Sequence, residues 1–343
     1  ISTPPKVSSV DGLNTTGTGK AEIYIKGGTI GIDGIENGMV FGSSRGDVNK
    51  PLERDDLLAW VYDTKVEIGT SGATTGPAVM GSIYGSGENG HTYNNVDVYL
   101  YSGTIGADHD GSEADKTRGN VYGGGCGTDK YYSDPTKETH DGNGEEYNPL
   151  AGVVYGNTTV TITGGKVRHN VYGAGAMGSV GKTTDGTTTG GKTTITISGG
   201  RIGVDGNDNG NVYGAARGKV DKTTAASGLA NVKETEVKIN YGSTLTSDGT
   251  ETDVNERTAQ LITGSVYGGG EAGTVKGDVK VEMTGGYVMH DVYGGGALAN
   301  TNTDNWDPAA NSGAGGWKVA SSDDQNYYVP VKHLTAGTSV VTG

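Results

Sequence analysis

Short runs of alternating apolar and polar residues, each followed by a turn rich in glycine, recur along the chain. The clearest run is IYIKGGTI at residues 23–30. Similar runs begin at Val98, Val160, Ile195, Val237 and Val281. Alternation with a period of two residues predicts a strand with one buried face. The glycine pair predicts a tight turn that requires a positive φ angle.

A second motif consists of an aliphatic residue, an aromatic residue and a glycine, and we call it the VYG motif. It occurs seven times, at residues 40–42, 83–85, 121–123, 171–173, 212–214, 266–268 and 292–294. The only phenylalanine of the chain, Phe41, occupies the aromatic position of the first copy. The two closest copies place Tyr267 and Tyr293 26 positions apart. A period of roughly 20–50 residues is typical of solenoids, propellers and other repeat arrays.

A unit of this length has room for two or three short strands with tight turns, but not for a helix. A propeller blade needs roughly 40 residues, so the closest copies disfavour a propeller, which stays the alternative together with a sandwich. One unit cannot bury its own apolar face, and stacking of like residues on like supplies the core. The sequence therefore predicts an all-β fold, a right-handed parallel β-helix (β-solenoid) of about 6–8 coils, with residues 1–343 as a single domain.

Extra residues enter the unit at two points, after the VYG motif and between the glycine turn and the motif. Insertions at 47–81, 128–152 and 300–337 predict long loops on one face, which is often the binding face of a solenoid. Residues 1–20 form an N-terminal lead-in. Residues 338–343 resemble the first strand of a further unit. We therefore expect the chain to be a segment of a longer repeat protein, or its last unit to be covered by a partner.

Large aromatic residues are concentrated in these insertions. They are Trp60, Trp306, Trp317, Tyr131, Tyr132, Tyr327 and Tyr328. Aromatic rings outside a repeat core can form a platform on which sugar rings stack. Alternatively, such rings anchor long loops against the core as small apolar clusters. These seven residues are the candidate ligand-binding residues of the sequence.

Residues 205–210 (DGNDNG) match the first half of a calcium-binding loop. Such a loop supplies oxygen ligands at alternate positions, here Asp205, Asn207 and Asn209, and a glycine at the sharp turn. The twelfth position is Ala216 instead of the glutamate that completes a Ca²⁺ site. Turns rich in Asn, Asp and Gly also have this composition without a metal. A Ca²⁺ site is therefore one of two interpretations of this segment, and no other cofactor is expected.

Composition and charge restrict the class of protein. The net charge is −14, which would repel a phosphate backbone, so we expect no nucleic-acid partner. No apolar run reaches about 18 residues, so we expect no transmembrane segment. The single cysteine, Cys126, excludes an internal disulfide framework. A chain with one cysteine and 64 glycines is compatible with a secreted or bacterial surface protein.

The two motifs in succession, Gly-Gly-x-Ile followed by Asn-Val-Tyr-Gly-Gly-Gly, resemble the repeats of β-helical, adhesin-like cell-surface proteins of Bacteroidota. The resemblance covers nearly the whole chain and concerns architecture alone, so it transfers no catalytic or ligand residues. It implies an exported protein at the cell surface that contacts glycans, neighbouring cells or copies of itself, including end-to-end stacking into a filament. We therefore expect a non-enzymatic extracellular adhesin-like or scaffolding module.

The alternative function is a polysaccharide-active enzyme similar to pectate lyases, which are β-helices that bind acidic sugars with Ca²⁺ and a basic residue. That chemistry needs arginine or lysine clustered with carboxylates on one strand face. The arginines of the repeat units instead occur singly, as at Arg118, Arg168 and Arg201. The negative net charge is also unfavourable for a polyanionic substrate. The sequence therefore favours a binding module over an enzyme.

Overall fold

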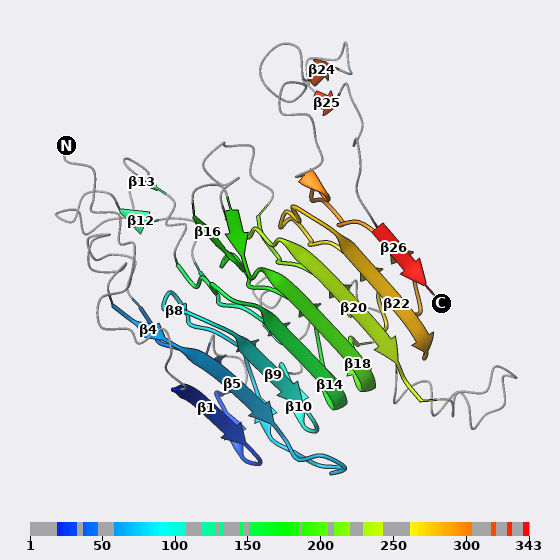
Figure 1. The fold of residues 1–343 in the computed structure, drawn as a ribbon. Coiled ribbons are helices and arrows are strands. Elements are labelled where there is room, and N and C mark those ends of the chain that lie inside the picture. Colours follow the sequence, from blue (N-terminus) through cyan, green and yellow to red (C-terminus); the bar gives the residue numbers. More distant parts are fainter. Residues whose placement is uncertain are drawn as a thin grey trace, which may run out of the picture.

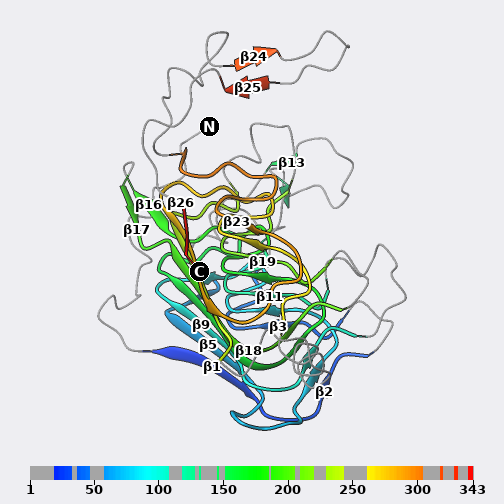
Figure 2. The ribbon, with the colours of Figure 1, turned by 90° about the vertical axis from the view of Figure 1, so that its right-hand side faces the viewer.

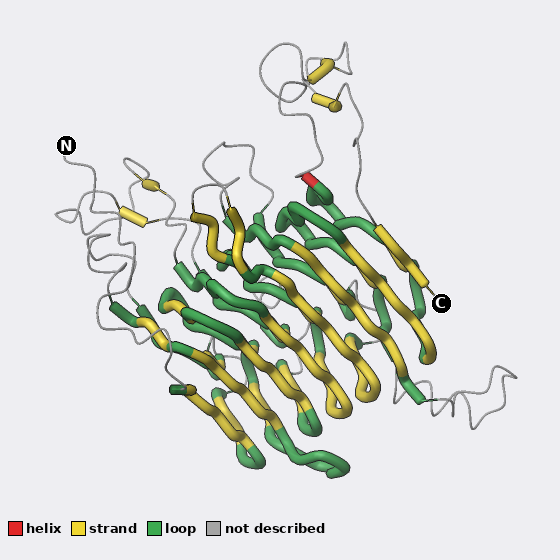
Figure 3. Tube along the Cα trace, viewed as in Figure 1, coloured by secondary structure: helices red, strands yellow, loops and turns green. Residues whose placement is uncertain are grey.

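The computed structural model shows a nearly all-β protein (Figures 1 and 3). It describes residues 19–32, 37–46, 58–107, 118–127, 131–132, 145–146, 151–184, 187–204, 209–219, 229–242, 261–303, 317–319, 328–330 and 339–342. Two parallel sheets contain most of the strands, and the chain alternates between them. Within the described residues, no helix has the length and apolar character needed to cross a membrane.

The larger sheet has eleven strands, and all of its strand pairs are parallel. Its main path follows β1 (Lys20–Ile25), β5 (Asp63–Ile68), β9 (Val96–Leu100), β14 (Thr158–Val167), β18 (Lys192–Ile202), β20 (Glu234–Asn240), β22 (Val279–Gly285) and β26 (Ser339–Thr342). Three two-residue strands extend it, namely β2 (Thr29–Ile30), β6 (Ala78–Val79) and β10 (Thr104–Ile105). The register between β14 and β18 shifts near Thr163.

The smaller sheet has seven strands and consists of the VYG motifs alone. Its order is β23 (Val292–Tyr293), β21 (Val266–Tyr267), β19 (Val212–Tyr213), β15 (Val171–Tyr172), β11 (Val121–Tyr122), β7 (Ile83–Tyr84) and β3 (Val40–Phe41). Each aliphatic residue pairs with the aliphatic residue of the next motif, and each aromatic residue pairs with the next aromatic residue. The predicted superposition of like residues is therefore confirmed.

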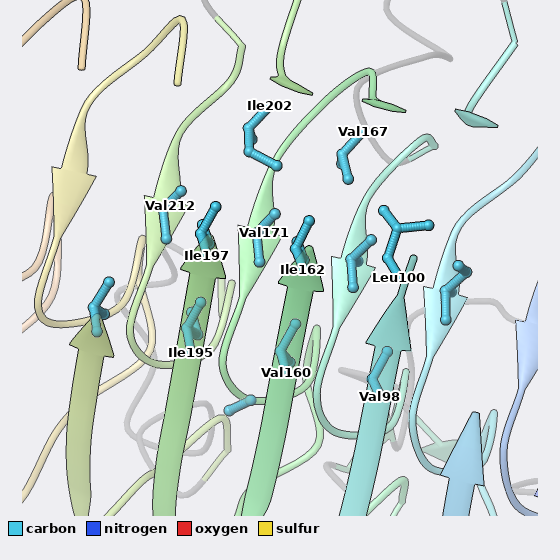
Figure 4. Close-up of a cluster of buried hydrophobic side chains, with 14 of the residues drawn as sticks. Val98, Leu100, Val160, Ile162, Val167, Val171, Ile195, Ile197, Ile202 and Val212 are labelled. Atoms are coloured by element: carbon cyan, nitrogen blue, oxygen red, sulfur yellow. The ribbon is translucent and has the colours of Figure 1, made fainter. Parts of the chain in front are cut away.

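The core lies between the two sheets, which face each other in Figure 2. Val160 and Ile162 of β14 and Ile195 and Ile197 of β18 are fully buried and lie in rows (Figure 4). Val171 of β15, with the other motif aliphatics, belongs to the same apolar cluster. Alternate residues of the long strands point inward, as their period of two predicted.

The aromatic residues of the seven VYG motifs form one continuous stack. Successive ring centroids lie 4.6–5.0 Å apart, and successive ring planes differ by 4–12°. Tyr122 and Tyr172 in the middle of the stack are buried, and this burial raises the pKa of both phenols. The hydroxyl of Tyr172 donates a hydrogen bond to the Glu271 carboxylate at 2.6 Å. The buried oxygen thus has a charged acceptor, which lowers the cost of its burial.

Polar side chains also repeat along the smaller sheet, at the residue before every VYG motif except the first, which follows Met39. The side-chain oxygen of Asn120 accepts the backbone N–H of Asn170 at 2.9 Å. The side-chain oxygens of Asn170 and Asn211 accept the corresponding N–H groups of the next units. Each unit therefore supplies a side-chain acceptor for the unit after it, which fixes the register between them.

Buried threonines connect the two sheets. The hydroxyls of Thr158, Thr193 and Thr235 donate to the carbonyl oxygens of the motif glycines, and the Thr158 bond to Gly173 is 2.5 Å long. These threonines begin the inward-facing rows of the long strands and are at most 3% exposed. These hydrogen bonds give the carbonyl groups of the motif glycines a donor from the larger sheet.

The interpretation of residues 47–81 as a loop insertion is wrong for its second half. Asp63–Ile68 form β5, which pairs with β1 and β9 in the larger sheet, and Val66 and Ile68 are fully buried. A lone Gly69 with φ of 80° makes the turn after β5. Residues 70–77 separate Gly69 from β6 (Ala78–Val79), whereas β10 (Thr104–Ile105) begins directly after Gly103, and this extra segment concealed the unit in the sequence.

Short antiparallel hairpins occur in three of the other insertions. They are β12 (Tyr131–Tyr132) with β13 (Glu145–Glu146), β16 (Lys182–Thr184) with β17 (Thr187–Thr189), and β24 (Trp317–Val319) with β25 (Tyr328–Pro330). Figures 1 and 2 show all three hairpins beyond the end of the larger sheet at which its long strands begin. The three described hairpins therefore lie at the same end of the larger sheet, and the single loop face of the complete insertions stays a prediction.

Candidate functional site

A short ladder of backbone pairs precedes the long strands and holds a second group of aromatic residues. β4 (Trp60–Val61) pairs in parallel with β8 (His91–Thr92), and Thr92 pairs with Val154. The residues that follow are Tyr62, Tyr93 and Tyr155, which stand just before β5, β9 and β14. Because these segments are in register, the three tyrosines lie side by side at the end of the larger sheet where its long strands begin.

Trp60, Tyr62, Tyr93 and Tyr155 form a half-exposed group that we call the outer aromatic cluster. The ring centroids of Tyr62 and Tyr93 lie 5.7 Å apart, and those of Tyr93 and Tyr155 lie 6.1 Å apart. The Trp60 ring lies 4.8 Å from the Tyr155 ring and 4.6 Å from the ring of the buried His91. Trp60 therefore anchors its segment to the core and also contributes to an accessible aromatic surface.

A row of polar side chains runs beside this cluster. The side-chain oxygens of Asp63, Asn95 and Asn157 accept the backbone N–H groups of Asn95, Asn157 and Lys192 at 2.9–3.0 Å. Asn95 and Asn157 are exposed. Aromatic faces next to amide groups on rigid backbone are a combination suited to sugars, which offer both C–H faces and hydroxyl groups.

The residues that the sequence analysis singled out do not all lie at this cluster. Trp60 belongs to it. Tyr131 and Tyr132 lie in β12, whereas Trp317 and Tyr328 lie in the separate hairpin β24–β25. Trp306 and Tyr327 lie outside the described residues.

Sequence reasoning missed three of the four rings of the outer aromatic cluster. Tyr62, Tyr93 and Tyr155 follow their VYG motifs at different distances, because insertions of different length precede them. The available signal was their position two or three residues before Thr64, Val96 and Thr158, the paired residues with which the inward-facing rows begin.

The predicted calcium site is only partly within the described residues. Asp205 and Asn207 lie outside them. The backbone carbonyl of Asn209 accepts a hydrogen bond from the Thr263 hydroxyl at 3.3 Å. Among the described residues, no group of three or more His, Cys, Asp or Glu side chains is placed to hold a metal ion. The Ca²⁺ interpretation stays a prediction.

The outward face of the larger sheet carries interleaved charges and tyrosines. On its first strands, the Lys65 ammonium lies 5.3 Å from the Tyr24 ring centroid and 5.6 Å from that of Tyr99. The hydrogen bond of Lys65 to Glu67 raises the pKa of this lysine, and its attraction to the same carboxylate adds to that effect. This face therefore combines a cation with two aromatic rings at a distance that permits cation–π attraction.

Further along the same face, Glu236 lies among three lysines. Its carboxylate is 2.7 Å from Lys192, 3.2 Å from Lys238 and 3.5 Å from Lys280. The hydrogen bond from Lys192, followed by that from Lys238, lowers the pKa of Glu236 to about 2. The three lysines come from three adjacent strands, so the carboxylate joins these strands electrostatically.

Replacing Glu236 by Gln should destabilise the protein by about 1 kcal/mol at pH 7, because the lysines are partly exposed and solvent screens the attraction. The pKa of Glu236 is lower in the folded state than the unfolded value of about 4.3. Its contribution is therefore present above about pH 4.3 and is lost as the pH falls toward 2. Urea unfolding from pH 7 to pH 2 should show the difference between wild type and E236Q shrinking over that range.

The control is Glu22→Gln, since Glu22 occupies the same column of the sheet on the edge strand β1. A surface change of this kind should alter stability by less than about 0.5 kcal/mol at any pH. A difference between wild type and E236Q that does not change with pH would contradict the electrostatic assignment.

Comparison of the chain with models of protein families, with curated proteins and with solved structures found no match.

Proposed function

We propose that the two parallel sheets are faces of a right-handed parallel β-helix that acts as a non-enzymatic extracellular scaffold and binds glycans through the outer aromatic cluster. The fold proposal is supported by the order of the strands. Each VYG strand is followed by a long strand of the larger sheet, and both sheets add their strands in the same order along the chain. Such a stack can lengthen without changing its cross-section.

The observation that carries the functional proposal is the geometry of Trp60, Tyr62, Tyr93 and Tyr155. Four rings within 4.8–6.2 Å of a neighbour remain partly accessible on backbone that is held in parallel register. A rigid aromatic surface loses little conformational entropy when a ligand stacks on it. The neighbouring asparagine row supplies polar groups that can fix the orientation of a sugar.

Charge indicates which glycans fit. With a net charge of −14, the protein would repel uronic-acid and sulfated polymers over long distances. Neutral polysaccharides, which contact the site through ring faces and hydroxyl groups, do not meet that repulsion. The resemblance to adhesin-like repeats of Bacteroidota agrees with exposure of such a surface outside the cell, and the bacterial cell surface is the proposed location.

Glycan-array binding followed by titration calorimetry tests the proposal. Wild type should bind a neutral polysaccharide, and Tyr62→Ala and Tyr93→Ala should each weaken binding about fivefold, since each removes one stacking ring worth about 1 kcal/mol. Tyr24→Ala is the matched control, because Tyr24 is 47% exposed but lies outside the outer aromatic cluster. Thermal melting of each variant shows whether it is folded.

Equal binding by Tyr62→Ala, Tyr93→Ala and wild type would remove the outer aromatic cluster as the site. The enzyme alternative is tested in the same preparation. Unsaturated sugar products after incubation with pectin- or alginate-type polymers would show a lyase and would overturn the non-enzymatic assignment.

A further inference from the structure

Two tyrosines in the middle of the aromatic stack are buried alike but differ in their hydrogen-bond partners. Tyr122 and Tyr172 are 0% and 2% exposed, and their ring centroids lie 4.7 Å apart with an angle of 9° between the ring planes. The Tyr172 hydroxyl donates to the Glu271 carboxylate at 2.6 Å. No described group accepts a hydrogen bond from the Tyr122 hydroxyl. The two phenols therefore differ in whether they can pass their proton to a neighbour.

The carboxylate reaches Tyr172 from two units further along the stack. Glu271 follows the VYG motif of β21, whereas Tyr172 belongs to β15, and β19 lies between these two strands. The side-chain amide of Asn170 also donates to the Tyr172 hydroxyl, at 3.3 Å. The phenol oxygen thus has one donor and one acceptor, and this pair can hold the oxygen in position after its proton has moved to Glu271.

The surroundings of Tyr122 oppose the loss of its proton. Burial raises the pKa of this phenol. The Arg217 guanidinium acts against that rise, but it only donates hydrogen bonds and cannot take up a proton. Asn120, the equivalent of Asn170, directs its side-chain amide to a backbone carbonyl oxygen at 3.4 Å. An electron taken from Tyr122 would therefore leave a positive charge that is buried and next to a cation.

We propose that Tyr172 and Glu271 form a proton-coupled redox site, on which the aromatic stack holds the oxidising equivalent when a one-electron oxidant attacks the protein. The oxidant takes one electron from the Tyr172 phenol, the O–H bond breaks, and the proton moves to the Glu271 carboxylate. The products are a neutral tyrosyl radical, a neutral carboxylic acid and the reduced oxidant. A one-electron reductant reverses the step, because the proton then returns from Glu271 to the phenol oxygen.

The geometry meets the requirements of this step. A group that takes a proton must lie within hydrogen-bond reach, about 2.6–3.2 Å, and the carboxylate oxygen of Glu271 lies 2.6 Å from the phenol oxygen. The two protein products are uncharged, so burying them costs less than burying a radical cation on Tyr122. The rings of Tyr122 and Tyr213 lie 4.7 Å and 5.0 Å from the Tyr172 ring in nearly parallel planes. An electron can pass between such rings, so an oxidising equivalent formed elsewhere in the stack can reach Tyr172.

Flash photolysis followed by electron paramagnetic resonance tests the proposal on the full chain. Photogenerated ruthenium(III) tris-bipyridine is the oxidant, and the sample is frozen after the radicals of exposed side chains have decayed. Wild type should retain a tyrosyl signal. Tyr172→Phe should reduce that signal about tenfold, whereas Tyr122→Phe, which keeps the ring contact and removes a hydroxyl without an acceptor, should stay within about twofold of wild type.

Glu271→Gln tests the proton acceptor separately from the phenol. The glutamine amide can accept the hydrogen bond but is too weak a base to take the proton, so the signal should fall about tenfold. Glu88→Gln is the matched control, because Glu88 also stands four residues after its motif tyrosine but its carboxylate pairs with Arg45 at 3.6 Å. This variant should keep the wild-type signal. Thermal melting shows whether each of the four variants is folded.

The absence of a lasting tyrosyl signal in wild type would overturn the proposal at once. A wild-type signal in Tyr172→Phe would place the radical elsewhere, and equal losses in Tyr172→Phe and Tyr122→Phe would show that Tyr172 has no special role. A wild-type signal in Glu271→Gln would remove Glu271 as the proton acceptor. None of these results bears on glycan binding, because the aromatic stack and the outer aromatic cluster share no residue.

Discussion

Val212→Asp should abolish cooperative folding, with a loss of more than about 4 kcal/mol in the free energy of unfolding. Val212 is fully buried and pairs with Val171 on one side and Val266 on the other. An aspartate there would place an uncompensated carboxylate in the apolar layer between the two sheets. Because each unit is stabilised by its neighbours, the damage should spread to the units on both sides.

Thr196→Asp is the matched control for this variant. Thr196 lies on the outward face of β18 and pairs with Lys238 on β20, so the new charge faces solvent and a lysine. Urea unfolding followed by circular dichroism, with limited proteolysis to locate the unfolded units, measures both variants. A V212D protein that melts like wild type would show that the VYG aliphatics do not form the core.

The second large effect is expected from Gly173→Ala, which should lower the free energy of unfolding by about 3 kcal/mol. A Cβ at Gly173 would overlap the carbonyl oxygen of Gly214 and would lie 3.0 Å from the Thr193 Cβ. Gly173, Gly214 and Thr193 belong to backbone held from several sides, so none of them can move without breaking the ladder. The expected loss of stability is therefore a steric effect of one added methyl group.

Gly27→Ala separates this steric effect from the general loss of a glycine. A Cβ at Gly27 would meet nothing within 4 Å. The free energy of unfolding of the G27A protein should therefore differ from that of wild type by no more than about 0.5 kcal/mol. Thermal melting of G173A and G27A, measured at the same concentration, gives the comparison. Similar melting temperatures for the two variants would mean that the strands around Gly173 can separate enough to admit the methyl group.

The stacking of like residues was predictable because both sequence signals are local. The VYG motif is three residues long and tolerates little change, so its copies at Val171 and Val212 can be aligned whatever lies between them. The period-two runs specify which side chains point inward. Together they predict both parallel ladders and the aromatic stack.

The outer aromatic cluster was not predictable in the same way. Tyr62, Tyr93 and Tyr155 come together because β5, β9 and β14 are in register, and that register depends on hydrogen bonds between residues far apart in the sequence. β5 itself was hidden because residues 70–77 separate its turn glycine, Gly69, from the next short strand. Side-chain ladders such as the one through Asn95 and Asn157 were also invisible, because the same residues are common in unstructured turns.

The segments that join the smaller sheet to the larger one differ greatly in length while the strands on either side keep their pairing. Residues 268–278 separate β21 from β22, whereas residues 294–338, about four times as many, separate β23 from β26. Closing a loop four times longer costs only about 1.2 kcal/mol in chain entropy. This junction is therefore a natural place to splice in a foreign epitope or a small domain, and an evolving lineage could exchange segments there while leaving the architecture intact.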